Sequence, residues 1–449
     1  MNNKIQVIRS TLTGREFRNR ISHSWKTSWP MIFIMLFEFL ISLTDVYIAG
    51  ILGKDIQATV GFVSQMYFIF IVIANALTVG TVTVTSQVKP GQKGNLNTAA
   101  STSLVSAVIA GLFLGIAGVI LTPFVIPFID VPEKIQKLAP SLLMVYAVGL
   151  MFHYVLITTN GLLRARKMIK RSLVTMAVIC VTNIGLNFLL VFHTSAGYLG
   201  IALSTVISIV IGAIINIGHV KGAIVTGIGF SRQYLLRIAG IGWPSGLLQV
   251  GWQVGSAVLF VILGSLPHHS VEVIAAFTMG LRIEAAIFLP AFAFNLANAV
   301  IVGNFIGEDR HDEAYKNGLS TAVIGVTIII VITGLVMLNA RRIAPLLSDN
   351  PIVIDEAVRY IYISMISEPF MAWGVILGGG LNGAGDTRSV MKIIILSLWI
   401  VRLPLSYATG IALGLGPVAI WWSMNTSQVV QCCFITRRYL GKKWLYNET

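Results

Sequence analysis

The sequence predicts an all-helical integral membrane protein with twelve transmembrane helices, arranged as two homologous six-helix lobes around a central cavity. Of its 449 residues, 55% are hydrophobic and only 11% are charged, which is more apolar surface than a water-soluble core can hide. The apolar segments are continuous, as in residues 323–338, whereas barrel strands would alternate apolar and polar residues. A repeated pattern along the chain then predicts the two lobes.

The apolar segments are long enough to cross a hydrocarbon layer of roughly 30 Å, which takes about 20 helical residues. In order along the chain, we expect spans near 28–52, 58–86, 98–128, 138–162, 171–192, 197–219, 236–264, 271–303, 316–340, 357–379, 389–411 and 414–436.

Three short motifs recur at offsets of 214, 219 and 216 residues. They are Trp29-Pro30 with Trp243-Pro244, Gly161-Leu162 with Gly380-Leu381, and Leu199-Gly200 with Leu415-Gly416. Because each half contains an even number of spans, the halves share one orientation and an axis along the membrane normal. This predicts lobes at 27–219 and 236–436, a cytoplasmic linker at 220–235, and cytoplasmic segments at 1–26 and 437–449.

The positive charges predict the orientation. With the N-terminus inside, twenty-four Lys and Arg residues fall in cytoplasmic segments and six fall outside, so both termini are expected in the cytoplasm. Anionic lipid headgroups are a sufficient binding partner for the net charge of +14. We therefore assign the protein no nucleic-acid role. The first apolar stretch is too long for a signal peptide and is expected to remain as the first helix of a multi-pass cell-membrane protein, in the inner membrane if the source is Gram-negative.

Ionisable residues within spans are functional candidates, because charge is costly in a membrane interior. Glu38 and Asp45 are seven residues apart in the first span, so they share a helix face and lie roughly 10 Å apart along the axis. Burial favours the neutral acid, which makes Asp45 a candidate for proton uptake. Pro30 lacks a backbone N–H and marks a possible bend. The alternative is a carboxyl that is only structurally hydrogen-bonded.

Other polar residues within spans have weaker patterns. Asn183 and Asn187 share a face of the fifth span, and Thr205 lies at mid-depth in the sixth; they offer either cation ligands or interhelical packing. Glu284, two residues after Arg282, and Glu368, which precedes Pro369 and could mark a helix break, are possible accessory coupling residues. Arg402 fits packing or interface anchoring better.

A substrate cavity is predicted in the second lobe. Gln249 and Gln253 form a polar stripe one turn apart. Aromatic and Met side chains accept many ligand shapes, although lipid-facing or core positions are the alternative. The apolar candidates are Trp252, Phe288, Phe292, Phe294, Met371 and Trp373.

Several activities find no support in the sequence. The three cysteines have neither metal-ligand spacing nor a disulfide pattern, and no Walker motif, nucleophile elbow or metal-binding His cluster occurs. We therefore expect neither an enzyme nor a bound cofactor.

With these residues placed, the chain resembles the multidrug and toxic compound extrusion (MATE) family over almost its whole length. The resemblance is carried by Pro30, Thr44-Asp45 and Gly50 in the first span, by Gly161 to Arg171 followed by Asn183-Ile184-Gly185-Leu186-Asn187, by Gly242-Trp243-Pro244, and by Gly380 to Thr387. It implies that Asp45, Asn183, Asn187 and Thr205 form a cation or proton site, with Pro30 permitting the first helix to bend.

Two departures from the family pattern refine this reading. Many relatives have an aspartate where Asn187 stands, so a single carboxylate remains and proton coupling is favoured over Na⁺. Relatives of the NorM-like branch have functional acidic residues in the seventh and tenth spans. Near those places this chain has Trp252 or Gln253 and Met371 instead, which favours the DinF-like branch.

The resemblance therefore implies a monomeric secondary antiporter that exports amphipathic, often cationic organic compounds in exchange for protons. Na⁺-coupled export, or flipping of a lipid or lipid-linked saccharide, is the alternative.

Overall fold

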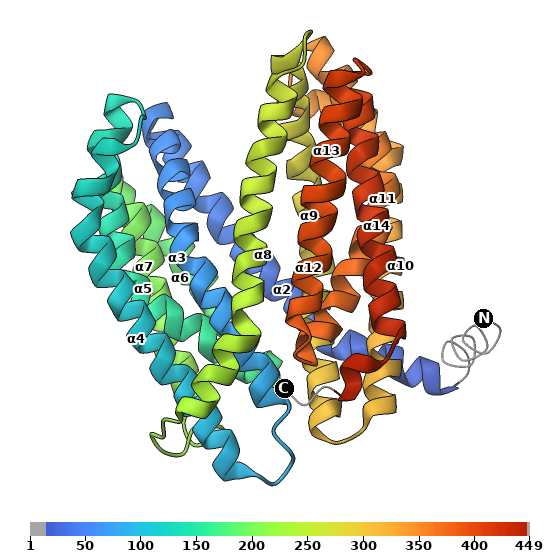
Figure 1. Cartoon of the computed structure of the whole chain (residues 1–449). Coiled ribbons are helices and arrows are strands. Elements are labelled where there is room, and N and C mark those ends of the chain that lie inside the picture. The colour runs from blue at the N-terminus through green and yellow to red at the C-terminus, as the bar shows by residue number, and fades with distance from the viewer. Residues whose placement is uncertain (1–14, 447–449) are drawn as a thin grey trace, which may run out of the picture. The chain divides into compact units, whose positions relative to one another are not determined.

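The computed structural model describes residues 15–446, and the parts of the predicted cytoplasmic segments at 1–14 and 447–449 lie outside it. The chain folds into helices throughout this range (Figure 1). The first six are α2 (Arg15–Leu52), α3 (Lys54–Ser86), α4 (Lys93–Val125), α5 (Glu133–Ala165), α6 (Ile169–Phe192) and α7 (Leu199–Val220). The others are α8 (Arg232–Gly264), α9 (Ser270–Gly307), α10 (His311–Ile343), α11 (Pro351–Gly383), α12 (Thr387–Leu396), α13 (Leu403–Ser406) and α14 (Pro417–Leu440).

The predicted all-helical membrane fold is confirmed. Within residues 15–446, eleven helices are long and apolar enough to cross a membrane, the stretch Thr387–Ala412 counting as one. The twelfth helix, α14, has 24 residues but a lower hydropathy. Its polar residues Asn425, Gln428 and Gln431 are buried, so they face other helices rather than lipid.

The eleventh span is not the uniform helix that its apolar pattern suggests. After α12 the backbone takes π-helical turns at Ser397–Arg402 and, beyond α13, at Tyr407–Ala412. Pro404 follows the first of these turns, and its missing N–H loosens the regular hydrogen-bond ladder. Such π-turns are frequent at functional sites, and the first one carries Arg402.

The chain divides into two compact units, one of residues 33–246 and the other of residues 15–32 with 247–446. In the first, which we call the N-terminal unit, α5 packs against α3, α4 and α7. In the second, the C-terminal unit, α11 packs against α9, α10 and α14. The division falls inside α2 and α8, whereas the sequence analysis placed the linker at 220–235.

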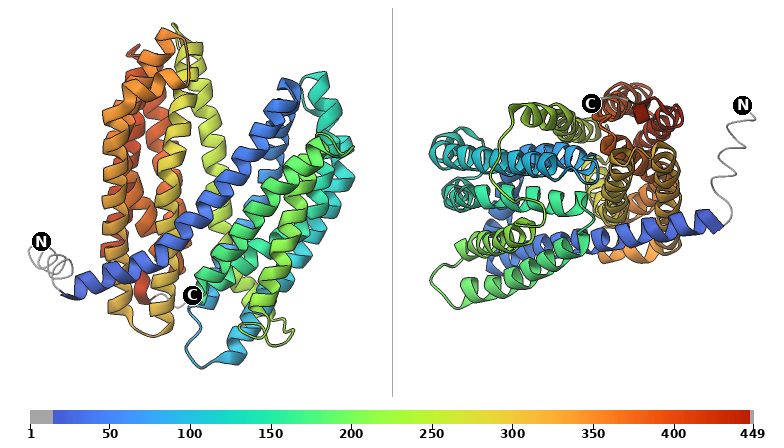
Figure 2. Two further views of the ribbon diagram at one scale, coloured as in Figure 1. Left: turned by 180° about the vertical axis from the view of Figure 1, so that it is seen from behind. Right: turned by 90° about the horizontal axis from the view of Figure 1, so that it is seen from below.

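The first turns of α2 belong to the C-terminal unit because their polar side chains have partners there. Ser24 Oγ lies 2.8 Å from Thr321 Oγ1 of α10, and Arg20 Nε lies 3.6 Å from Glu313 Oε2. Figure 2 shows α2, in blue, as one long helix, and Pro30 lies within it without ending it.

The first part of α8 belongs to the N-terminal unit because glycines let two backbones meet. A Cβ atom on Gly80 of α3 would lie 2.1 Å from the Ile238 carbonyl oxygen, and one on Gly242 would lie 2.3 Å from that of Ala76. Only a residue without a side chain fits at such a crossing. Gly242, which precedes the second copy of the Trp-Pro motif, thus has a packing role in α8.

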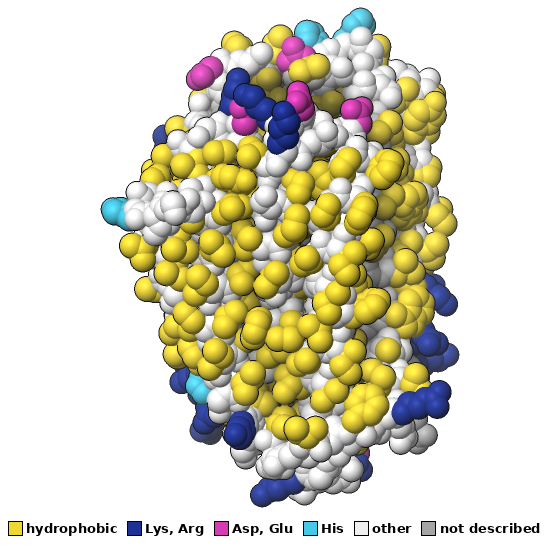
Figure 3. All heavy atoms as spheres, turned by 90° about the vertical axis from the view of Figure 1, so that its left-hand side faces the viewer, with side chains coloured by type: hydrophobic (Ala, Val, Ile, Leu, Met, Phe, Trp, Pro, Cys, Tyr) yellow, Lys and Arg dark blue, Asp and Glu magenta, His cyan; other side chains and the backbone are white. Residues whose placement is uncertain are grey.

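The outer surface of the N-terminal unit fits a membrane environment. Figure 3 shows one face covered by a broad belt of apolar side chains, with Lys and Arg below the belt and charges of both signs above it. Exposed side chains such as Phe113, Phe124 and Val181 contribute to this apolar surface. A soluble protein would rarely expose so large an apolar patch.

Candidate functional site

Asp45 lies at the centre of a hydrogen-bonded cluster inside the N-terminal unit. Asn187 Nδ2 donates to Asp45 Oδ1 over 2.8 Å, and Thr205 Oγ1 donates to Asp45 Oδ2 over 3.2 Å. Asn183 Nδ2 in turn donates to Thr205 Oγ1 over 3.1 Å. The four residues that the sequence analysis grouped by resemblance are therefore adjacent in the structure. We call them the Asp45 cluster.

Helix geometry explains how three helices build this cluster. On α6, Asn183 and Asn187 are one turn apart and face the same way, so Asn187 Nδ2 also donates to Asn183 Oδ1 over 3.3 Å. Both amides are fully buried, whereas Asp45 on α2 is half-buried. The apolar packing of Ile48, Val63 and Ile201 beside it fixes α2 against α3 and α7.

One oxygen in the cluster has no hydrogen bond. Asn187 Oδ1 is buried and receives no donor from the described residues. A buried amide oxygen without a donor is costly and calls for a proton donor, a water molecule or a cation. The cluster therefore has one formal negative charge and one unfilled acceptor, which suits a single positive charge.

Three further residues near Asp45 were not predicted from the sequence. Tyr146 of α5 is buried beside Asp45 and Thr205, and its ring lies 5.0 Å from that of Tyr67 on α3. Tyr67 Oη is in turn hydrogen-bonded to Nδ1 of His153, which lies on α5, at 2.8 Å. Residues 146 and 153 are two helical turns apart, a spacing that places them on one face. No sequence signal tied that face to Asp45.

Glu38 and Pro30 lie on the same helix as Asp45, but outside the cluster. Glu38 is exposed and lies within electrostatic range of Arg164 on α5. Pro30 lies fifteen residues before Asp45, which is roughly 22 Å along a helix axis.

A second group of ionisable side chains lies inside the C-terminal unit. Tyr360 Oη donates to Glu284 Oε1 over 2.5 Å. Glu284 of α9, Glu368 of α11 and Arg402 lie within electrostatic range of one another. Glu368 is buried, and its Oε2 has no hydrogen-bond partner among the described residues. Two carboxylates thus share one guanidinium.

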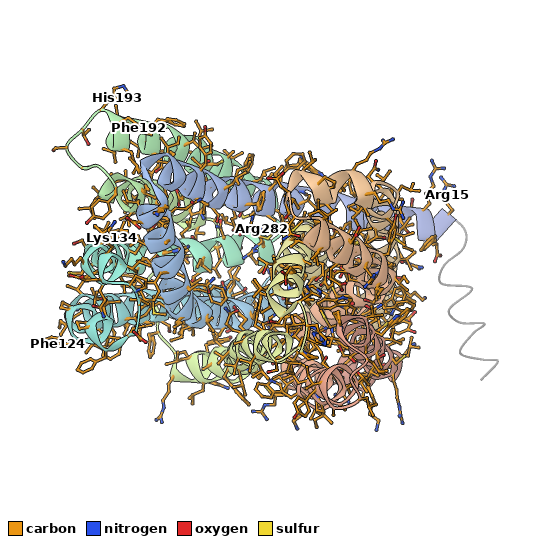
Figure 4. All side chains as sticks on the ribbon, turned by 90° about the horizontal axis from the view of Figure 1, so that it is seen from above. Arg15, Phe124, Lys134, Phe192, His193 and Arg282 are labelled. Atoms are coloured by element: carbon orange, nitrogen blue, oxygen red, sulfur yellow. The ribbon has the colours of Figure 1, made fainter. Side chains whose placement is uncertain are left out.

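Of the two roles expected for Arg402, the structure supports packing and not anchoring at the membrane interface. Its side chain is buried, its Nε donates to Ser427 Oγ over 2.9 Å, and its guanidinium lies 5.2 Å from the Trp252 ring centre. The suggestion that Pro369 breaks the tenth span is wrong, because α11 continues through it. By contrast, Arg282 is exposed and projects away from the helices of its own unit (Figure 4).

The predicted cavity residues lie in different environments. Trp252, Gln253, Phe288 and Phe292 are exposed, and the rings of Phe288 and Phe292 stack with centres 5.6 Å apart. Gln249, Met371 and Trp373 are half-buried. Phe294 is fully buried in the core that includes Ile376 and Tyr439, so its cavity assignment is wrong.

No group of three or more His, Cys, Asp or Glu side chains within residues 15–446 is arranged to hold a metal ion. The Asp45 cluster supplies one carboxylate, two amides and a hydroxyl, which together suit a proton or one monovalent cation. Such side chains within apolar helices are typical of ion and proton pathways.

Many membrane-crossing helices with carboxylates held between them are the features of a polytopic membrane transporter. The MatE family model matches residues 30–189 and 244–408. The chain belongs to the MATE family of multidrug efflux transporters.

Similar proteins agree with this assignment. YisQ, an uncharacterized transporter of Bacillus subtilis, is 23% identical over 433 residues, covering 93% of this chain and 94% of its own. A probable multidrug resistance protein NorM of Thermotoga maritima is 21% identical, covering 93% and 92%. A crystal structure of MATE in complex with MaL6 matches with a TM-score of 0.87 at 19% identity, covering 96% of this chain and all of that one; this likeness concerns the fold.

Proposed function

We propose that the chain exports amphipathic, often cationic organic compounds in exchange for protons, with Asp45 as the proton-binding residue. The supporting observation is that Asp45 is the one carboxylate in a cluster whose other members are amides and a hydroxyl. One carboxylate is enough to bind one proton, because protonation neutralises its charge. We also propose that the protein acts as a monomer in the cell membrane with both termini in the cytoplasm.

Proton binding would change the hydrogen bonds of the cluster. An ionised Asp45 accepts from Asn187 on one oxygen and from Thr205 on the other. A proton on Oδ2 would reverse the bond to Thr205, whose hydroxyl can accept from the carboxyl while it donates to the Ile201 carbonyl oxygen 3.1 Å away. A proton on Oδ1 would set two donors against each other, because the Asn187 N–H cannot accept. In that second case the carboxyl would rotate or α2 would move. Since Pro30 lies on the same helix, a bend there is the proposed route by which the change reaches the substrate path.

The driving force follows from the membrane potential and the proton gradient. Each elementary charge that crosses the membrane contributes roughly 2.3 kcal/mol per 100 mV. The proton and the substrate must each bind the inward and outward states with different affinity, or the cycle has no direction.

Na⁺ is the second candidate ion, supported by the unfilled Asn187 Oδ1 beside Asp45. Against it, the cluster has a single carboxylate. In the C-terminal unit, Glu284 and Glu368 remain candidates for accessory coupling, since they lie near one guanidinium. The absence of carboxylates at Gln253 and Met371 supports placement in the DinF-like branch.

The test is efflux of a fluorescent organic cation from energised vesicles under a pH gradient or a Na⁺ gradient. We expect pH-driven efflux in the wild type and none in Asp45→Asn. The control is Asp55→Asn, which removes an exposed carboxylate that pairs with Lys134 in the same unit. Full pH-driven efflux in Asp45→Asn would refute the proposal. Efflux driven only by Na⁺ would favour the second ion, and no efflux under either gradient would favour lipid flipping.

A further inference from the structure

The loop that joins α7 to α8 is fastened to α4 of the N-terminal unit. Asn97 Oδ1 accepts from the backbone N–H groups of Thr226 at 2.7 Å and Gly227 at 3.1 Å. Ser101 Oγ donates to the Gly227 carbonyl oxygen over 2.8 Å, and Ile224 is buried in a core shared with α4 and α5. Figure 1 shows this loop, in yellow-green, at the lower end of the unit. The loop is therefore held in one place by both polar and apolar contacts.

Two apolar side chains project from this loop. Ile228 is 94% exposed and Phe230 is 55% exposed. They follow one span and precede the next, since α7 ends at Val220 and α8 begins at Arg232. Exposure of such side chains to water is unfavourable, whereas the interfacial region of a bilayer takes them up.

The charges at this end of the unit are of one sign. It is formed by three segments, residues 87–98, 161–171 and 217–237. Together they contain ten Lys or Arg residues (two, five and three in turn) and no Asp or Glu. Figure 3 shows Lys and Arg side chains gathered below the apolar belt of the unit. Such a surface attracts anions.

Three of these cations lie beside the loop. Lys221 and Arg232 are exposed at its two ends. Lys93, also exposed, precedes Asn97 by one turn of α4, so it lies on the helix face to which the loop is bonded. The two apolar side chains and the three cations therefore belong to one surface.

The predicted cytoplasmic segments of the C-terminal unit are different, because their cations have acidic partners. Asp312 lies 2.5 Å from Lys316 and 3.9 Å from Lys442, and Arg438 Nε lies 2.6 Å from Asp386 Oδ2. A positive excess that served only to orient the chain would not require this difference between the units. The basic end of the N-terminal unit thus calls for anions from outside the chain.

We propose that residues 221–231 and the cations around them form a docking surface for the anionic headgroups of the cytoplasmic leaflet, with Ile228 and Phe230 inserted between the lipids. Lipid phosphates satisfy the cations, and the adjoining lipid chains cover the apolar side chains. A nucleic acid or an acidic soluble protein would match the cations alone. The proposal rests on the orientation put forward above, but not on proton coupling or on the identity of the substrate.

The test measures where position 228 lies and which lipid surrounds it. Ile228→Cys is made in the full chain together with Cys432→Ser and Cys433→Ser, which leaves only the buried Cys180. The new thiol carries an apolar fluorophore, and the protein is placed in phosphatidylcholine nanodiscs. Quenching is compared for aqueous iodide and for nitroxide-labelled phosphatidylglycerol and phosphatidylcholine. We expect several-fold stronger quenching by the anionic lipid than by the zwitterionic lipid, and weak quenching by iodide.

Lys221→Gln with Arg232→Gln should lower the preference for phosphatidylglycerol, since each cation at an anionic surface changes binding by up to about fivefold. The matched control is Arg310→Gln with Lys442→Gln, which removes two cations that have acidic partners in the C-terminal unit and should leave the preference unchanged.

Strong quenching by iodide with none by either lipid would overturn the proposal and would assign the surface to a soluble partner. Equal quenching by the two lipids would also overturn it, because the cations would then select no headgroup. A fluorophore at position 230 gives the same comparison if the first variant fails to fold. Neither a gradient nor a substrate is present, so the outcome is independent of the proposed efflux.

Discussion

Asn187 Nδ2 donates to Asp45 Oδ1 over 2.8 Å, joining residues 142 positions apart in the sequence. The same nitrogen reaches Asn183 Oδ1 at 3.3 Å. One amide group therefore ties α2 to α6, while its own oxygen receives no hydrogen bond from the described part of the chain. Position 187 thus controls both the hydrogen bonds of Asp45 and the number of negative charges beside it.

Asn187→Asp is expected to make the protein respond to Na⁺. The second carboxylate gives the cluster two negative charges and several oxygen ligands, which a hard cation favours. We expect Na⁺ to raise the melting temperature of the variant, but not that of the wild type, in detergent at constant ionic strength. Asn216→Asp is the control, because Asn216 is equally buried but bonds to Asn160 instead; a Na⁺ response there would contradict the explanation.

Thr205→Val should reduce proton-driven efflux about tenfold, the effect of losing roughly 1.4 kcal/mol of hydrogen bonding to a charged group. Valine has nearly the same shape but neither donates to Asp45 nor accepts from Asn183. Thr205→Ser keeps the hydroxyl and should retain most of the rate. Initial efflux rates at matched expression levels distinguish the two variants, and equal rates would mean that the hydroxyl has no part in coupling.

Pro30→Ala should slow efflux several-fold while leaving substrate affinity unchanged. Alanine supplies the missing N–H and stiffens α2 between its two ends. The measurement pairs equilibrium binding with efflux rates, and a melting temperature at or above that of the wild type shows that the variant folds. Pro140→Ala, which makes the same exchange within α5, is the control. A Pro30→Ala variant that transports normally would remove the proposed bend.

Tyr360→Phe should destabilise the C-terminal unit by about 1–3 kcal/mol, because it removes the hydroxyl that donates to the half-buried Glu284 carboxylate. Tyr360 is fully buried and packs edge-on against Trp421, so the phenylalanine ring keeps the apolar contacts. Thermal unfolding in detergent measures the change. Tyr362→Phe alters an exposed ring two residues away and should have no effect.

Gly242→Ala should destabilise the protein by about 1–3 kcal/mol through overpacking against the Ala76 carbonyl of α3. Gly185→Ala is the matched control: a Cβ at that position meets open space, and alanine favours the helix over glycine. The control should therefore melt at the same temperature or higher. Opposite shifts of the two variants on one thermal scan verify the close crossing of α3 and α8.

The sequence predicted the helices well because apolar periodicity is a local property. Spacing alone also placed Asn183 and Asn187 on one face of α6. It did not link them to Asp45; that connection came from family resemblance, and the geometry agrees with it. Contacts among residues far apart in the sequence were missed, including Tyr146 beside Asp45 and the arrangement of Glu284, Glu368 and Arg402. The π-turns between α12 and the end of the eleventh span, one of which carries Arg402, were missed as well, because no hydropathy pattern reveals them.

The chain crosses from one unit to the other inside α2 and again inside α8. This has a consequence for a protein that is cleaved between its two halves. A break in the loop between α7 and α8 gives two fragments, each carrying a helical segment whose packing partners are in the other fragment. Ser24 and Arg20 bind α10 from one fragment, and Gly242 packs on α3 from the other. The two fragments thus exchange helix ends, so packing contacts tie one to the other in addition to the loop that joins them.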